Sequence, residues 1–169
     1  MASFGRWGAM AATAFVGSWL ALHPARADDP AFITGAVGLF DVLDNEEATS
    51  FNVEYRSGLK LAFLKPFGGA MVTTDRATYG YGGFLVDIYF GRRLVLTGNT
   101  AVGLWANGHG KKLGSFVEFR SGLELAFRFD NRSRLGVGFH HISNAGLGHS
   151  NPGTEILSLI YSIPLGGGN

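Results

Sequence analysis

The chain contains no cysteine. Disulfide scaffolds, thiolate zinc sites, cysteine nucleophiles and a lipid-modified N-terminal cysteine are therefore excluded, and any catalysis must use oxygen, imidazole or carboxylate groups. Charge is also scarce, because charged residues make up only 16% of the 169 residues and the formal net charge is +1. This balance lacks the basic surplus with which proteins bind nucleic acid by releasing counterions, so nucleic acid is not an expected partner.

Residues 1–27 have the pattern of a secretory signal peptide. A short charged region is followed by an apolar run, and the small-residue sequence Ala25-Arg26-Ala27 ends the segment. The apolar run is shorter than the ~20 residues that a membrane-spanning helix needs. We therefore expect cleavage after Ala27, export from a bacterial cytoplasm, and a single mature domain of residues 28–169.

Sustained helical spacing is missing from residue 31 onward, whereas the two-residue period of strands recurs almost without a break. The clearest case lies between Ser115 and Phe129, where one face is apolar and the other holds glutamate, arginine and small residues. Turn residues divide the chain into about eight strands, near residues 31–42, 50–57, 59–73, 77–90, 92–106, 113–129, 132–144 and 153–164. An even number of strands, joined alternately by tight turns and longer polar loops, is typical of an outer-membrane barrel.

Alternation alone does not show which face points outward, since a soluble eight-stranded ligand carrier has the same period with its apolar face inward. We favour the membrane barrel, because the polar face mixes both signs of charge with glycine and alanine and could fill a narrow lumen. The expected fold is therefore all-β: an eight-stranded antiparallel up-and-down transmembrane β-barrel. Aromatic residues near the expected strand ends would form girdles at the membrane interfaces: Phe40, Tyr55, Phe90, Trp105 and Phe129.

Three polar residues interrupt the apolar face of the last two strands: His141, Ser143 and Glu155. Residues at i and i+2 of a strand lie about 6.6 Å apart on one face, and a hairpin closed by residues 145–152 can place His141 opposite Glu155. The three then have the order of a serine hydrolase. Ser143 would attack an ester carbonyl, His141 would accept its proton, and Glu155 would orient the imidazole.

The segment Asn144-Ala145-Gly146 follows the serine and offers an amide side chain and backbone N–H groups for an oxyanion site. The other histidines of the mature chain fit structural roles: His140 as a lumen residue, and His109 and His149 as loop residues. No spacing typical of metal ligands is present, so we expect no metal site. On the residues alone, an interfacial patch of polar strand ends remains the alternative to catalysis.

The stretch His141-Ile142-Ser143-Asn144-Ala145-Gly146, followed by Asn151-Pro152-Gly153-Thr154-Glu155, resembles the signature of the PagL family, the outer-membrane lipid A 3-O-deacylases. The resemblance also covers Val53-Glu54-Tyr55-Arg56, Tyr79-Gly80-Tyr81-Gly82-Gly83 and Phe119-Arg120-Ser121-Gly122-Leu123-Glu124. It implies an eight-stranded barrel whose active site faces the membrane, with the family's histidine, serine and glutamate at His141, Ser143 and Glu155, and its asparagine at Asn144. The implied reaction is hydrolysis of the ester that links a 3-hydroxyacyl chain to the 3 position of lipid A, without a metal or cofactor.

The expected partners are then lipid A and the outer membrane, and the sequence leaves room for a homodimer. Because lipid A carries phosphates, Arg76, Lys111 and Lys112 on loops at the expected outer side are candidate headgroup contacts. The last strand departs from many outer-membrane barrels, since Ile163-Pro164-Leu165 stands where an aromatic residue is common and Tyr161 is the nearest aromatic. A non-enzymatic outer-membrane barrel, either an adhesin or a structural component, and a soluble periplasmic carrier are the alternative functions.

Overall fold

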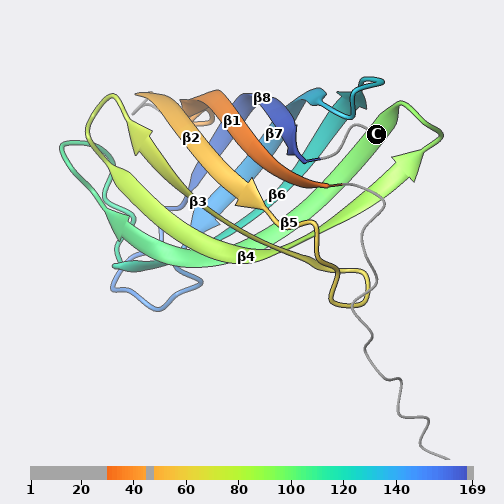
Figure 1. The fold of residues 1–169 in the computed structure, drawn as a ribbon. Coiled ribbons are helices and arrows are strands. Elements are labelled where there is room, and N and C mark those ends of the chain that lie inside the picture. Colours follow the sequence, from red (N-terminus) through yellow and green to blue (C-terminus); the bar gives the residue numbers. More distant parts are fainter. Residues whose placement is uncertain (1–29, 45–47, 167–169) are drawn as a thin grey trace, which may run out of the picture.

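The computed structural model describes residues 30–44 and 48–166, and within them eight antiparallel strands follow one another around a closed barrel (Figure 1). The strands are β1 (Ala31–Phe40), β2 (Ala48–Arg56), β3 (Lys65–Thr73), β4 (Thr78–Phe90), β5 (Leu94–Ala106), β6 (Val117–Arg128), β7 (Arg134–Ser143) and β8 (Thr154–Leu165). Pairing of β8 with β1 closes the barrel, so the predicted fold class is confirmed. The predicted signal peptide of residues 1–27 lies outside the described residues. In the described part of the chain, no helix is long and apolar enough to cross a membrane.

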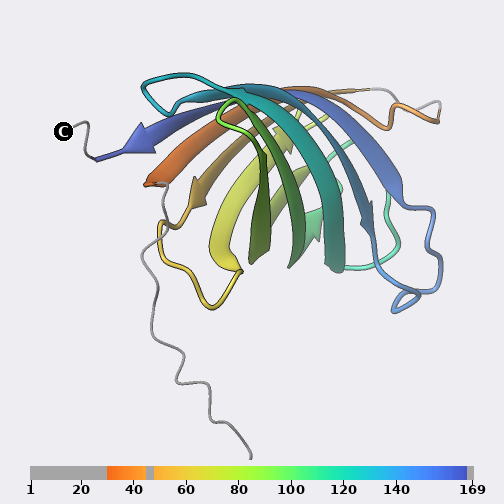
Figure 2. The ribbon, with the colours of Figure 1, turned by 90° about the vertical axis from the view of Figure 1, so that its right-hand side faces the viewer.

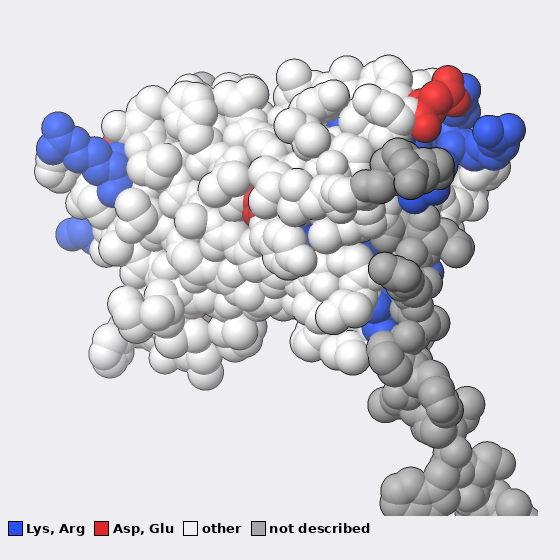
Figure 3. Space-filling view, in the orientation of Figure 1, with Lys and Arg blue, Asp and Glu red and all other residues white. Residues whose placement is uncertain are grey.

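The outer surface of the barrel is predominantly apolar. In β1, for example, Ile33, Val37 and Leu39 are exposed, while Phe32 and Thr34 at alternate positions are buried. On the face shown in Figure 3, basic side chains gather at both ends, acidic side chains show mainly at one of them, and the broad band between the ends is nearly free of charge. Such a large apolar surface is unfavourable in water and matches the hydrocarbon core of a bilayer. The barrel is therefore a transmembrane barrel, and the soluble carrier is excluded.

Ion pairs occupy part of the lumen, as the mixed polar face predicted. Arg56 bonds Glu54 at 2.7 Å and Glu124 at 2.8 Å, and all three side chains are buried. Arg120 contacts Glu54 at 3.1 Å, and His140 Nε2 lies 3.3 Å from Glu124 Oε1. His140 is thus a lumen residue, as expected, whereas the next residue, His141, lies on the outer face of the barrel.

The prediction of an aromatic girdle is wrong for two of its five residues. Phe40 and Trp105 are buried inside the barrel, where their rings stack with centroids 5.7 Å apart. Their neighbours Leu39 and Leu104 face outward, so strand alternation turns both aromatic rings inward despite their position near strand ends. The other three expected girdle residues are exposed: Tyr55, Phe90 and Phe129.

The largest boundary error concerns the strand expected at 59–73, which begins only at Lys65. Residues 57–64 form a loop in which Leu61 and Leu64 make an isolated bridge, and Ala62 between them has a φ of 59°. A left-handed residue reverses the chain direction and is incompatible with a continuous strand. The alternating leucines of this segment therefore belong to a turn.

The connections between strands alternate between the two ends of the barrel (Figures 1 and 2). The turns after β4 and β6 and the loop after β2 lie at one end, with the beginning of β1 and the end of β8. The opposite end holds the connections after β1, β3, β5 and β7. The residues 144–153 between β7 and β8 lie at this second end, and the candidate site begins beside them.

Candidate active site

His141 and Glu155 meet on the outer face of the barrel. His141 is the third residue from the end of β7, Glu155 is the second residue of β8, and the two are direct cross-strand partners. Their side chains are joined by a hydrogen bond of 2.9 Å between Nδ1 and Oε1. This is the register that the sequence predicted. Since a carboxylate only accepts, the bond places a proton on Nδ1 and leaves Nε2 of the neutral ring as the basic nitrogen.

Ser143 ends β7 on the same outward face and is half-buried. Among the residues that the structure describes, no hydrogen bond links its hydroxyl to His141. The two residues are separated by about 6.6 Å of extended backbone, a distance that these side chains are long enough to span by leaning together. Catalytic hydrogen bonds in ligand-free enzymes are often long and tighten only with substrate. The structure thus brings His141 and Glu155 together and leaves Ser143 beside them.

Gly153 sets the position of the imidazole from the other side. A methyl group on Gly153 would lie 3.0 Å from Cε1 and 3.6 Å from Nε2 of His141, and the φ of Gly153 is +66°. Gly153 also lies one step beyond the Ile142–Thr154 pair, which is the level of Ser143. The Nε2 edge of the ring therefore faces the end of the strand pair where Ser143 lies. Sequence reasoning missed this residue, although the Asn-Pro-Gly turn pointed to a special backbone position.

Asn144 is a structural brace and not a free donor. Its side chain is fully buried, and its NH2 group donates to the carbonyl oxygens of Leu113 at 2.8 Å and Ser150 at 2.7 Å. Its amide oxygen accepts a hydrogen bond of 2.9 Å from the backbone N–H of Gly146. The predicted oxyanion donors Asn144 and Gly146 are therefore both occupied by contacts that hold the loop, and this part of the prediction is corrected.

Two donors remain near the serine. Among the described hydrogen bonds, none uses the backbone N–H of Ala145, the third predicted donor. Asn151, to which the sequence assigned no role of its own, accepts a 3.0 Å hydrogen bond through its amide oxygen from the backbone N–H of Asn144. Because this contact fixes which end of the amide faces Asn144, the NH2 group of Asn151 is left to serve a ligand.

A second brace holds the beginning of β8 from inside the barrel. Lys111 bonds Asp41 at 2.5 Å and Asp44 at 2.7 Å, and Thr154 donates to Asp41 at 2.9 Å. Burial by itself lowers the pKa of Lys111, but its hydrogen bonds to the two acids outweigh this and raise the pKa above its ordinary value. Lys111 is buried and fully engaged, so its predicted role as a phosphate contact is wrong. Arg76 and Lys112 are exposed, and their headgroup role stays a prediction.

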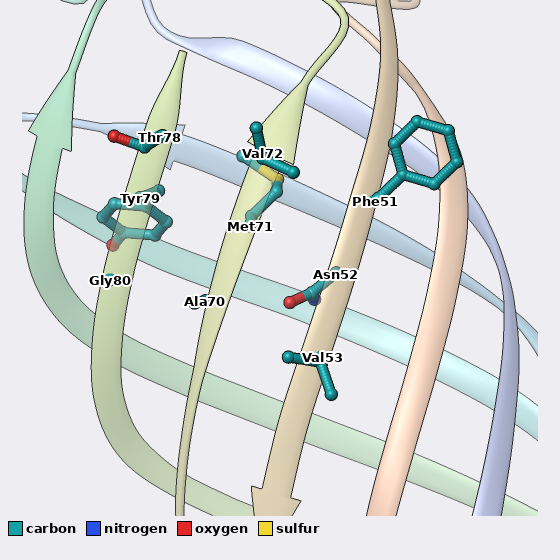
Figure 4. A pocket seen from close by; sticks show the side chains of 9 residues that line it. All are labelled: Phe51, Asn52, Val53, Ala70, Met71, Val72, Thr78, Tyr79 and Gly80. Carbon is teal, nitrogen blue, oxygen red and sulfur yellow. The ribbon is translucent and has the colours of Figure 1, made fainter. Parts of the chain in front are cut away.

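A hollow of about 460 Å³ opens on the lipid-facing side elsewhere, between β2, β3 and β4 (Figure 4). It exists because Ala70 and Gly80, which face outward side by side, are smaller than Val53 and Val72 around them. Its lining includes no histidine, acid or serine. In the closed order of strands, β3 is four strands from β7, so the hollow lies across the barrel from His141 and is not part of the site.

The described residues include no group of three or more histidine, aspartate or glutamate side chains placed to hold a metal ion. The pair of His141 and Glu155 is instead the arrangement of a base and the acid that orients it. With a hydroxyl two residues away on the same face, this arrangement suits acyl transfer.

A family model for PagL, lipid A 3-O-deacylase, matches residues 77–164. The match covers more than half of the chain, from just before β4 into β8, and contains His141, Ser143 and Glu155. The chain belongs to the PagL family. The signature resemblance found in the sequence is thereby confirmed at the level of the family.

Two PagL relatives match over short stretches of this chain. Over 52 residues it is 36% identical to lipid A deacylase PagL of Bordetella bronchiseptica, a stretch covering 31% of this chain and 29% of the relative. Over 55 residues it is 40% identical to lipid A deacylase PagL of Pseudomonas aeruginosa, with 32% of each protein covered. The matched stretches thus span about a third of each relative's length.

Solved structures agree on the fold. The crystal structure of the outer membrane enzyme PagL aligns with 79% of this chain and 99% of that chain, at a TM-score of 0.64 and 18% identity. A de novo designed transmembrane β-barrel aligns with 83% of this chain and 100% of its own, at a TM-score of 0.58 and 9% identity. At such low identity these likenesses concern the barrel itself, and the PagL assignment depends on the family match.

Proposed function

We propose that this protein is an outer-membrane lipid A 3-O-deacylase that acts as a serine esterase through Ser143, His141 and Glu155. The observation that carries the proposal is the 2.9 Å hydrogen bond between His141 and Glu155 on the lipid-facing surface. A polar pair on the outside of a transmembrane barrel is costly. Family membership and the names of the PagL relatives support lipid A as the substrate that would meet such a pair within the bilayer.

In the first half of the reaction, the hydroxyl oxygen of Ser143 attacks the ester carbonyl carbon while Nε2 of His141 takes the hydroxyl proton. Glu155 stabilises the resulting imidazolium. The tetrahedral intermediate then collapses, the bond to the sugar oxygen breaks, and the imidazolium returns its proton to that oxygen. The acyl chain is left as an ester on Ser143. In the second half, His141 deprotonates a water molecule, which attacks the acyl ester. The bond between the acyl carbon and the Ser143 oxygen breaks, the imidazolium returns its proton to that oxygen, and the 3-hydroxy fatty acid is released.

The oxyanion of the intermediate needs donors, and we assign this role to the Ala145 N–H and the Asn151 NH2 group. Asn151→Asp tests the assignment, because its carboxylate keeps an acceptor for the Asn144 N–H and removes the NH2 donor. Loss of one oxyanion donor lowers kcat by about 100-fold or more. A variant with unchanged kcat on lipid A in mixed micelles would exclude Asn151 from this role.

The position of the site explains how the substrate arrives. His141 and Ser143 lie within the last three residues of β7, about 7 Å or less along the strand from its end. Lipid A already resides in the outer leaflet, with its esters just below the headgroups. It reaches Ser143 by lateral diffusion, and its acyl chains lie over outward apolar residues such as Val137 and Leu159, which are exposed and paired with each other.

Mass spectrometry of lipid A from cells that produce the wild type or Ser143→Ala tests the proposal. We expect wild-type cells to lose one 3-hydroxy fatty acid and cells with the variant to retain it. Equal amounts of folded barrel must be present in the outer-membrane fraction of both strains. Unchanged lipid A in the wild-type strain would indicate a non-enzymatic barrel. A free N-terminus at Asp28 in the same material would bear out the signal peptide.

A further inference from the structure

Polar side chains are rare on the lipid-facing surface, and they lie together. Leaving aside the first and last two residues of each described strand, the outward positions hold apolar residues, glycine or Tyr161, with three exceptions. The exceptions are Thr100 in β5, Ser121 in β6 and His141 in β7. Because three separate strands contribute one residue each, their grouping depends on how the strands pair.

The strand register places these residues in one continuous row across the wall. His141 has Glu155 as its partner on one side and Ser121 on the other, and Ser121 is in turn the partner of Thr100. The row slopes away from the loop end of the barrel. Glu155 is the second residue of β8, whereas Ser121 is the fifth residue of β6 and Thr100 is the seventh residue of β5 counted from its loop end. The two hydroxyls therefore lie deeper in the membrane than the pair of His141 and Glu155.

Apolar side chains border the hydroxyls on both sides. Phe119 and Val102 lie toward the loops, and Leu123 lies toward the middle of the membrane, all of them exposed on the outer face. In hydrocarbon a hydroxyl has little water to bond, and leaving it without a partner is costly. Ser121 and Thr100 thus offer hydrogen bonds to a polar group of a molecule embedded in the same leaflet.

We propose that Ser121, with Thr100 next to it, binds the hydroxyl group of the acyl chain that is cleaved and thereby selects hydroxylated chains. This inference rests on the proposed esterase function of Ser143. The depth of the row points to the acyl chain, because the sugar and phosphates of the substrate lie on the opposite side of Ser143, toward the loops. A chain that extends from the ester into the membrane passes over Ser121.

The distances fit one acyl chain. Ser121 is the diagonal neighbour of Ser143 on adjacent strands, and diagonal neighbours lie about 7–8 Å apart. A reacting carbonyl carbon lies about 3 Å from the attacking oxygen, and a hydroxyl hydrogen bond adds about 2.8 Å. The hydroxyl of a 3-hydroxyacyl chain is attached two carbon–carbon bonds beyond the carbonyl carbon. One chain can therefore present its carbonyl to Ser143 and its hydroxyl to Ser121.

Two synthetic lipid A analogues that differ only in the 3-hydroxyl of the chain at the 3 position test the proposal. Initial rates of the full mature barrel in mixed micelles give kcat/KM for each analogue. We expect the wild type to prefer the hydroxylated chain, and Ser121→Ala to lower kcat/KM for that chain roughly 3- to 10-fold, as expected for one lost hydrogen bond. The rate on the plain chain should change by a much smaller factor, and Thr100→Val should act in the same direction.

Thr78→Val is the matched control, since Thr78 is also an exposed outward hydroxyl but lies in β4, outside the row. It should leave the preference between the two analogues unchanged. If Ser121→Ala lowers both rates by the same factor, or if the active wild type does not distinguish the analogues, the selection proposal is wrong and the esterase proposal stands. A folded wild type that cleaves neither analogue would overturn both.

Discussion

Replacement of Glu155 by glutamine isolates the electrostatic part of the proposed mechanism. The change keeps the size of the side chain and removes its negative charge. In the ground state His141 is a neutral ring that donates from Nδ1, and an amide oxygen can accept that bond. In the transition state the ring becomes an imidazolium, and only the carboxylate stabilises its charge. The loss should therefore fall on kcat rather than on KM.

The magnitude follows from the geometry of the pair. For charges 2.9 Å apart, Coulomb's law gives about 6 kcal/mol at an effective dielectric constant of about 20 and about 1.4 kcal/mol in bulk water. The side chains of His141 and Glu155 are 44% and 21% exposed, so the site lies between these limits. We expect a loss of about 3 kcal/mol, which corresponds to a roughly 100-fold lower kcat.

The assay is the initial rate of fatty-acid release from lipid A in mixed micelles, with the folded fraction measured for each variant. Asp130→Asn is a matched control, because Asp130 is an exposed acid paired with Arg93 at the other end of the barrel. It should leave the rate unchanged. A Glu155→Gln variant that is folded and retains the wild-type kcat would refute the assigned role of the carboxylate.

Two further changes test the support of the site. Gly153→Ala should lower kcat at least 10-fold by pushing the imidazole of His141 out of place, because one misplaced group costs up to about 100-fold. The control is Gly91→Ala, which has the same φ of +66° but open space around it and should leave kcat unchanged. Equal losses of kcat in the two variants would show that backbone strain alone is responsible. Lys111→Met should lower the free energy of unfolding by about 3 kcal/mol, because it leaves Asp41 buried without its cation. Urea unfolding in micelles measures this loss; unchanged stability with weaker lipid A binding would restore Lys111 as a headgroup contact.

Strand alternation and turn residues were sufficient to predict the barrel, and they also predicted the pairing of His141 with Glu155. Both depend on short-range information, since the two-residue period assigns each side chain to a face and the hairpin length limits the register of adjacent strands. The errors at Phe40 and Trp105 arose where position near a strand end was given more weight than the alternation itself, which turns both rings inward.

The braces of the site could not be predicted in this way. Lys111 and Asn144 are polar residues in loops, and the sequence does not show which distant groups they meet. Lys111 bonds Asp41, which lies 70 positions earlier in the chain, and Asn144 bonds the carbonyl of Leu113. Only the closed barrel brings these loops together. The row of Ser121 and Thr100 beside His141 likewise required the registers of β5, β6 and β7.

In the proposed reaction, a lipid-facing serine becomes acylated with the help of His141 and Glu155. Acid-quenching the purified wild-type barrel soon after mixing with lipid A, followed by peptide mass spectrometry, tests it most directly. We predict that the peptide containing Ser143 gains the mass of one 3-hydroxyacyl group, and that Ser143→Ala abolishes both this adduct and fatty-acid release. Turnover with an acyl group on Ser121 instead, or turnover that persists in Ser143→Ala, would contradict the account.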